Sequence, residues 1–275
     1  MDAFDYTMQL QVGCPGGCLF CYVPNGSGIV PKTIRGEYGE QWGFVVKNKE
    51  KVVNKLIREL NKGTLADKTI YWSGVTDPYA SPPAVTHELW QALIATESHL
   101  KPRRIAIQSR FHVDRDVEML AEHVNSTSSS DGGPPVVVSY SIGTDRNDLI
   151  AAWEKSTPWF EQRMNVIQNL RARDTCVVAT LSPLGLWDEL EVALHQLKEW
   201  GVPYITTLLF KEGNRGANTP RRFRAYLKEH YPMLMDEGWQ AEMATSMRSA
   251  YGENRVLVGQ AGFASLTKPH LVAPK

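Results

Sequence analysis

The sequence is poor in cysteine, has no excess charge of either sign and lacks any long apolar run. No stretch approaches the roughly 18 consecutive apolar residues that a membrane-spanning helix requires. The first residues, MDAFDYTMQLQVG, also lack the basic start and apolar core of a signal peptide. These absences predict a cytoplasmic protein that has no membrane partner.

Charge is balanced, with 30 basic and 30 acidic residues and a formal net charge of zero. Proteins that wrap duplex nucleic acid usually carry a broad basic surface. The composition therefore argues against such a surface and leaves room only for a local basic groove.

The four cysteines of the 275-residue chain are unevenly placed. Three of them, Cys14, Cys18 and Cys21, fall within eight positions, and Cys176 is remote from them. Cytosolic thiols stay reduced, so the triplet suits a metal site better than disulfides. The count allows one cluster and excludes a second cluster with four cysteine ligands.

Short β-rich runs alternate with helical stretches whose apolar residues recur every three or four positions. The predicted strands are Thr7–Val12, Thr69–Gly74, Arg104–Ser109, Val136–Ile142, Cys176–Leu181 and Tyr204–Phe210. The predicted helices are Lys49–Leu60, Ala84–Thr96, Val117–His123, Pro158–Arg171 and Trp187–Trp200.

This alternation predicts an α/β fold with a parallel sheet and right-handed crossovers. Six units indicate an open, partial (β/α)6 barrel of the TIM type, with its chemistry at the carboxyl ends of the strands. We expect residues 1–213 to form the barrel and 214–275 a C-terminal helical extension packed on it, as a single structural unit. Residues 22–47 are predicted to form a long loop, and residues 125–135 a flexible surface linker.

The strongest motif is GCPGGCLFCY, a Cys-x3-Cys-x2-Cys run directly after the first predicted strand. A [4Fe–4S] cluster normally takes four cysteine ligands, so three cysteines leave one iron open to another molecule. The alternative is structural zinc, which needs four closed ligands. Its fourth ligand would be Cys176 or a histidine such as His87 or His112, and zinc motifs usually present cysteines in pairs.

The triplet, with Phe20 directly before Cys21, resembles the signature of the radical S-adenosylmethionine (SAM) superfamily. The segments CLFCYVP, VVKNKEKVVNKLIREL, WSGVTDPY, HVDRDVEML and SYSIGTD resemble, in order and spacing, the spore photoproduct lyase-like branch. The resemblance covers roughly residues 8–185.

This resemblance implies a partial barrel of the radical SAM type and a [4Fe–4S] cluster held by Cys14, Cys18 and Cys21. It implies SAM chelated at the open iron and an electron donor such as flavodoxin or ferredoxin. Reductive cleavage of SAM would then give a 5′-deoxyadenosyl radical that abstracts hydrogen from the substrate.

The resemblance also implies SAM-binding positions at the strand ends. Ser109 stands where relatives often carry a lysine near the SAM carboxylate, with Arg110 beside it as another source of positive charge. Ser141 and Arg163 match a serine and an arginine placed near SAM, and a guanidinium pairs well with a carboxylate. The full set of predicted cofactor-binding residues is Phe20, Tyr22, Gly74, Thr76, Asp77, Ser109, Ser141 and Arg163.

Each of these positions also has a purely structural interpretation. Asp77-Pro78 is typical of a turn that opens a helix. For Arg163, the structural alternative is a position on the solvated face of its helix. Relatives continue TDPY with a Gln-Pro and a Glu, whereas this chain has Ala80 and Ser81, so the resemblance does not extend to that glutamate. Cys176 begins a predicted strand, away from the cluster, and is predicted to be structural because free cysteines are usually buried.

Three functions remain open from the sequence. The first is radical chemistry on a nucleic-acid base, to which the basic and aromatic stretch RRFRAYLKEHY would contribute. That stretch is also typical of an amphipathic capping helix, which is the interpretation we favour for it. The second is the same chemistry on a small metabolite or peptide, and the third is a non-catalytic metal-binding interaction protein. The sequence assigns no catalytic side chain.

Overall fold

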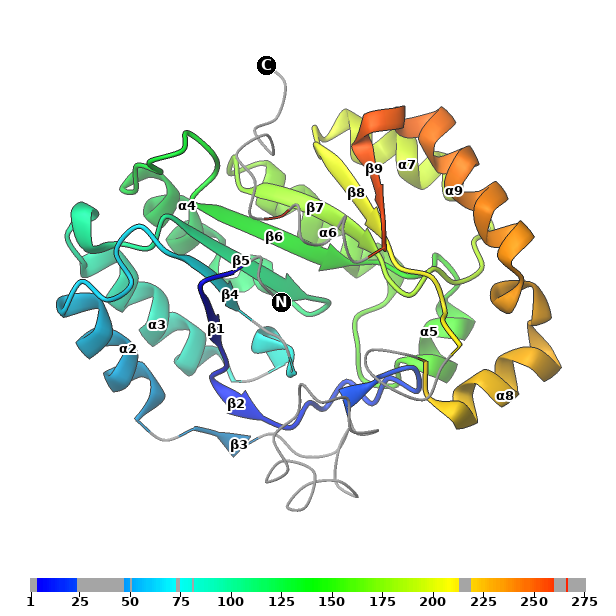
Figure 1. Cartoon of the computed structure of the whole chain (residues 1–275), viewed down its shortest axis with the longest axis horizontal. Coiled ribbons are helices and arrows are strands. Elements are labelled where there is room, and N and C mark those ends of the chain that lie inside the picture. The colour runs from blue at the N-terminus through cyan, green and yellow to red at the C-terminus, as the bar shows by residue number, and fades with distance from the viewer. Residues whose placement is uncertain are drawn as a thin grey trace.

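The computed structural model describes residues 4–23, 47–49, 51–72, 75–80, 82–212, 219–259 and 266. The core element is a seven-stranded sheet with the order β1-β4-β5-β6-β7-β8-β9, and every neighbouring pair is parallel (Figure 1). The strands are β1 (Tyr6–Met8), β4 (Thr69–Trp72), β5 (Arg104–Ser109), β6 (Val136–Ser141), β7 (Cys176–Leu181), β8 (Tyr204–Thr207) and β9 (Val256–Val258).

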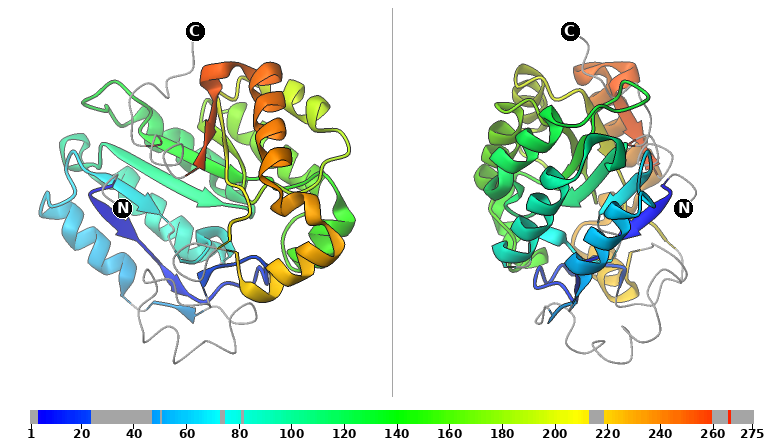
Figure 2. Two further views of the ribbon diagram at one scale, coloured as in Figure 1. Left: turned by 45° about the vertical axis from the view of Figure 1, so that its right-hand side comes forward. Right: turned by 90° about the vertical axis from the view of Figure 1, so that its left-hand side faces the viewer.

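Helices cover one side of this sheet, as two further views show (Figure 2). The helices are α2 (Val52–Asn61), α3 (Pro83–Ala95), α4 (Val117–Asn125), α5 (Asn147–Trp153), α6 (Phe160–Arg171), α7 (Leu190–Glu199), α8 (Arg221–His230) and α9 (Glu237–Tyr251). In the described residues β1 and β9 form the two edges and do not pair with each other. The sheet is therefore an open, partial barrel, which confirms the predicted fold class.

The strands bury both of their faces, because side chains alternate along each strand. On the outer face, residues such as Ile105, Val138 and Leu181 pack with the helices in the main core. On the inner face Tyr71, Val137 and Cys176 form a smaller apolar cluster that Phe4 and Leu266 contact. All-apolar runs such as Val136–Val138 are thus explained by burial on both sides.

Polar side chains replace the apolar ones toward the carboxyl ends of the central strands. The hydroxyls of Ser139 and Thr180 lie 2.6 Å apart, and Thr206 donates to the Thr180 hydroxyl at 2.9 Å. All three are buried, so the row meets its hydrogen-bonding needs internally. Polarity therefore rises toward the edge of the sheet where the predicted site lies.

Four predicted strands have different bounds: β6 ends one residue before Ile142, β4 ends at Trp72 with residues 73 and 74 outside the described ranges, and the other two differ more. The run Thr7–Val12 splits into β1 and β2 (Gln11–Val12), and β2 pairs antiparallel with β3 (Lys47–Asn48) in a second sheet. The break falls at Leu10, whose carbonyl accepts from the Lys49 N–H. The run Tyr204–Phe210 ends as a strand at Thr207. Leu208 N–H donates to the carbonyl of Leu181, the last residue of β7, and the Leu208 carbonyl accepts from the N–H of Leu184 in the loop after β7.

The segment 125–135 is not the free linker that its composition suggests. Asp131 accepts hydrogen bonds from Arg104 Nη2, the Ser129 hydroxyl and the Gly133 N–H at 2.7, 2.7 and 3.0 Å. Arg104 Nε also donates to the Pro134 carbonyl at 2.9 Å. Because Arg104 is buried, this side chain fastens the segment to the amino end of β5, and the linker prediction is wrong in this respect.

The segment that was expected to be an extension is helical, as predicted, but it also supplies a strand. Helices α8 and α9 are followed by β9, which pairs with β8 from Ile205↔Val256 to Thr207↔Val258. The boundary at residue 213 stays a prediction. Every helix in the described ranges is too short or too polar to cross a membrane.

Candidate functional site

The cysteine loop follows β1 and β2 and lies at the carboxyl edge of the sheet, beside α5 and α8 (Figure 1). Gly13 and Gly17 adopt φ angles of 82° and 62°, a left-handed conformation that glycine adopts most readily. A turn with Cys21 N–H donating to the Cys18 carbonyl at 3.0 Å completes the loop. The glycines of the motif thus serve to curl the backbone around its cysteines.

Gly16 lies beside the sulfur atoms of two of the cysteines. A methyl group on Gly16 would lie 3.5 Å from both Cys14 Sγ and Cys18 Sγ and 3.6 Å from the Phe111 ring. The two sulfurs therefore flank one small space next to bare backbone. Such a cradle fits an inorganic cluster, whose ligands approach from several sides.

No set of three His, Cys, Asp or Glu side chains in the described ranges converges on one metal ion. A cuboidal cluster differs from a single ion, since each cysteine binds a separate iron. Zinc gathers its cysteine ligands at about 2.3 Å from one centre, so the two metal groups require different arrangements of the three sulfurs. The assignment of Cys14, Cys18 and Cys21 as ligands of a four-iron cluster stays a prediction.

The Cys14 and Cys18 thiols are shielded from water but lie near charged side chains. Burial, followed by the charge of the Asp77 carboxylate, raises the pKa of the Cys14 thiol to about 11, although hydrogen bonds from the Gly16 and Asp77 N–H groups oppose the rise. Burial also raises the pKa of Cys18 far above its ordinary value, although the Arg110 charge opposes this effect. Such thiols would be neutral without a metal, so the binding of iron must release their protons.

The backbone holds the loop against the segment that follows α5. Cys18 and Glu154 form an antiparallel bridge, and Leu19 N–H donates to the Trp153 carbonyl at 2.8 Å. Ser156 N–H donates to the Gly16 carbonyl at 3.3 Å. Helix α5, which the periodicity did not predict, is therefore the element that positions the cysteine loop.

Glu154 lies at the centre of a buried ion network. Its Oε2 accepts hydrogen bonds from Arg110 Nη1 and Arg163 Nη2, both at 2.8 Å. The side chains of Glu154 and Arg163 are 2% and 0% exposed. Burial alone would raise the pKa of Glu154, but the two guanidinium groups lower it to about 2. The carboxylate is therefore ionised throughout the physiological range.

Sequence reasoning missed Glu154 and gave Arg110 only a secondary role. Arg110 comes directly after β5 and turns back over the Phe20 ring, 5.1 Å from its centroid. Burial alone would lower the pKa of Arg110, but Glu154 and Cys18 raise it. A signal for Glu154 was present in AAWEKSTPW, where a single acid interrupts an apolar helix end.

The predicted residues Asp77 and Ser109 meet at the carboxyl ends of β4 and β5, and Thr76 directly precedes Asp77. Asp77 Oδ1 accepts from the Ser109 hydroxyl at 2.7 Å and from the Tyr79 N–H at 2.9 Å, and Oδ2 accepts from the Arg110 N–H at 2.8 Å. Burial raises the pKa of Asp77 above its ordinary value, although these hydrogen bonds oppose the rise. Asp77 thus forms the turn of the structural alternative, and the proposed contact between Asp77 and SAM stays a prediction. Gly74 lies outside the described residues.

The remaining predicted residues are distributed around the same edge. Ser141 ends β6 and is buried beside Thr180, while Arg163 is buried in the ion network, so its solvated alternative is wrong. The Phe20 ring contacts Phe223 of α8 at 6.1 Å. Burial, followed by the charge of Cys21, raises the pKa of Tyr22 to about 12.

Cys176 is separate from this group. It begins β7 on the inner face, in the cluster formed by Tyr71 and Val137. Burial raises its pKa to about 12, although Arg171 and Arg104 oppose the rise. The structure therefore agrees with the prediction of a buried structural thiol.

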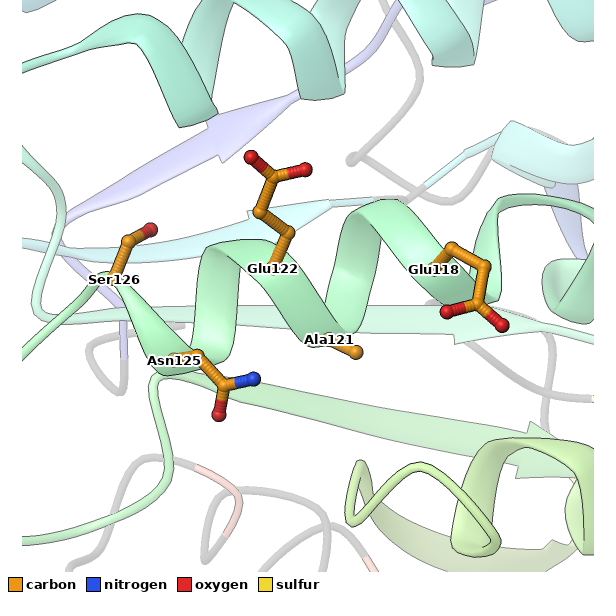
Figure 3. A pocket seen from close by; sticks show the side chains of 5 residues that line it. All are labelled: Glu118, Ala121, Glu122, Asn125 and Ser126. Carbon is orange, nitrogen blue, oxygen red and sulfur yellow. The ribbon is translucent and has the colours of Figure 1, made fainter.

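A hollow of about 520 Å³ lies elsewhere, on the outer surface of α4 (Figure 3). Its lining is largely exposed, and Glu118 is paired there with Arg173 at 2.7 Å. This hollow has neither the cysteines nor the buried charges of the strand edge. Its lining residues are Glu118, Ala121, Glu122, Asn125 and Ser126.

No family model and no curated protein matches the sequence. Among solved structures, spore photoproduct lyase complexed with dinucleoside spore photoproduct is similar, with a TM-score of 0.56 and 15% identity over 93% of this chain and 76% of that chain. A variant of that lyase with bound AdoMet and the same dinucleoside has a TM-score of 0.51 and 15% identity, covering 90% and 74%. SuiB of Streptococcus suis bound to S-adenosylmethionine has a TM-score of 0.51 and 11% identity, covering 92% and 49%. The chain therefore has the fold of spore photoproduct lyase and SuiB, an open parallel barrel.

Proposed function

We propose that this protein is a radical SAM enzyme. Cys14, Cys18 and Cys21 would each bind one iron of a [4Fe–4S] cluster, and SAM would occupy the fourth iron. The observation that carries the proposal is the glycine-lined space between the Cys14 and Cys18 sulfurs, at the carboxyl edge of an open parallel barrel. When bound, the cluster supplies the electron that cleaves SAM to methionine and a 5′-deoxyadenosyl radical.

The chain's own part is to bind SAM and to exclude water from it. Arg163 Nη1 is buried and has no hydrogen-bond partner among the described residues. Leaving a buried donor unpaired is costly, so we assign this atom to a carboxylate oxygen of SAM. Ser141, at the end of the neighbouring strand, would donate to the same carboxylate.

The proposed electron donor is a flavodoxin or ferredoxin, and for the substrate we favour a nucleic-acid base. The support is the fold shared with spore photoproduct lyase, whose structure was solved with dinucleoside spore photoproduct. The exposed Arg221 and Arg222 of α8 would contact phosphates. The aromatic residues of α8 support stacking less well, because Tyr226 stacks on Phe223 at 5.7 Å and contacts Tyr231 at 6.0 Å.

Binding to single- and double-stranded oligonucleotides over a range of salt concentrations tests this substrate class. Phosphate contacts release counterions, so affinity for a true nucleic-acid substrate must fall steeply as salt rises. An affinity that is indifferent to salt would favour the alternative, the same chemistry on a small metabolite or peptide.

The enzymatic proposal is tested by anaerobic reconstitution with iron and sulfide, followed by dithionite, SAM and an assay for 5′-deoxyadenosine. We expect this product from the wild-type protein and from Cys176→Ala. The variants Cys14→Ala, Cys18→Ala and Cys21→Ala should each abolish it, because each removes one iron ligand. An intact cluster that yields no 5′-deoxyadenosine would instead indicate a non-catalytic metal-binding protein.

A further inference from the structure

The buried network Arg110–Glu154–Arg163 joins three separate parts of the barrel. Arg110 follows β5, Glu154 follows α5, and Arg163 lies in α6. Both arginines donate to the same Glu154 oxygen, and Arg163 also donates to the Thr157 hydroxyl at 2.6 Å. Its three charges sum to +1, in surroundings where charges act over longer distances than in water.

This network directly adjoins the cysteine loop. The backbone of Glu154 bridges Cys18, and the Arg110 guanidinium lies over the Phe20 ring at 5.1 Å. Arg110 interacts electrostatically with the Cys18 thiol. Of the two arginines, Arg110 is thus the one whose charge reaches the proposed cluster from its Cys18 side.

The position of Arg110 depends on Glu154. An unpaired arginine would turn its charged head toward water, yet the Arg110 side chain is only 17% exposed and is held by Glu154. The Arg110 N–H is fixed as well, through Asp77 Oδ2 at 2.8 Å. Backbone and side chain are therefore both fastened, which leaves this cation little freedom to withdraw from the cysteine loop.

We propose that Arg110 sets the reduction potential of the cluster and that Glu154 is a positioning residue that holds Arg110 in place and offsets part of its charge. The inference rests on the proposed function, since it requires a cluster at Cys14, Cys18 and Cys21. Reduction adds a negative charge, so a nearby cation favours the reduced form and a nearby anion disfavours it.

The test is the midpoint potential of the cluster, measured by spectroscopic redox titration of the reconstituted holoprotein. Arg110→Gln should lower the potential. Glu154→Gln should raise it, because the amide oxygen of glutamine can still accept the hydrogen bond from Arg110 Nη1 while the negative charge of the carboxylate is lost. We expect each change to alter the equilibrium constant for one-electron reduction at least tenfold, which corresponds to about 59 mV. Arg110→Lys keeps the charge and should restore most of the wild-type potential.

Arg146→Gln is the matched control. Arg146 directly precedes α5, and its ion pair with Asp148, at 2.7 Å, lies on the surface. Removing its charge should leave the potential unchanged, because exposed charges are screened by solvent and salt. Parallel thermal unfolding of the apoproteins shows whether each variant is folded.

Opposite shifts in Arg110→Gln and Glu154→Gln support the inference, because general loosening of the site would move both in one direction. Unchanged potentials, or shifts of the same sign, would overturn it. If Glu154→Gln does not fold, the comparison of Arg110→Gln with Arg110→Lys decides: equal potentials contradict a role for the charge. A wild-type protein without any four-iron cluster would instead refute the proposed function itself.

Discussion

Replacing Gly16 by alanine should affect the stability of the fold and the binding of the cluster in opposite directions. The added methyl group would lie 3.5 Å from Cys14 Sγ and Cys18 Sγ and 3.6 Å from the Phe111 ring, which are ordinary van der Waals distances. The φ angle of Gly16 is outside the left-handed region, so alanine is tolerated there. A compatible Gly→Ala change usually stabilises a protein by about 0.4–1 kcal/mol, because it restricts the unfolded chain.

The cluster should respond in the opposite direction, since the methyl group fills the space between two of its ligands. We therefore expect Gly16→Ala apoprotein to be as stable as wild type or slightly more stable in urea, and its iron content after reconstitution to fall severalfold. Urea unfolding followed by circular dichroism gives the first quantity, and iron and sulfide analysis the second. Full iron uptake by a stable Gly16→Ala protein would refute the cradle interpretation of Gly16.

Two further predictions concern stability. His123 is buried, and burial, reinforced by the charge of Lys101, lowers its pKa to about 3. Below about pH 6.5 the His123 side chain therefore binds a proton in the unfolded chain but not in the folded one. The free energy of unfolding should consequently fall by about 2 kcal/mol between pH 6.5 and 5. Urea titrations at several pH values should show a smaller loss in His123→Phe, and equal slopes would contradict this assignment. Gly143→Ala would place a methyl group 2.8 Å from the Pro183 carbonyl oxygen, so the backbone there must shift. We expect the free energy of unfolding to fall by about 1–3 kcal/mol in the same urea assay. An unchanged unfolding midpoint would show that the loop moves aside at no cost.

Much of the barrel could be predicted from the sequence because burial is written into its strands. The runs Arg104–Ser109 and Cys176–Leu181 form strands with the predicted bounds, since β-branched residues packed on both faces leave little ambiguity. The cysteine motif likewise marked its own place, at the carboxyl edge. Local composition was sufficient to predict those segments whose structure depends mainly on their own residues.

The remainder depends on contacts between distant segments. Helix α5 is only seven residues long and gives too little periodicity to be recognised. The role of Glu154 depends on its ion pairs with Arg110 and Arg163, which are 44 and 9 positions away in the sequence. Similarly, the polar segment 125–135 resembles a linker until Arg104, in a neighbouring strand, binds Asp131. Pairings of this kind are set by the tertiary fold and leave no local pattern.

The central claim is that three cysteines hold a four-iron cluster and leave one iron open to SAM. Mössbauer spectroscopy of anaerobically reconstituted, iron-57-labelled protein, recorded with and without SAM, tests it most directly. The account predicts one four-iron centre per chain in which a single iron site changes when SAM is added. A mononuclear metal, or a four-iron centre whose spectrum is unaffected by SAM, would contradict it.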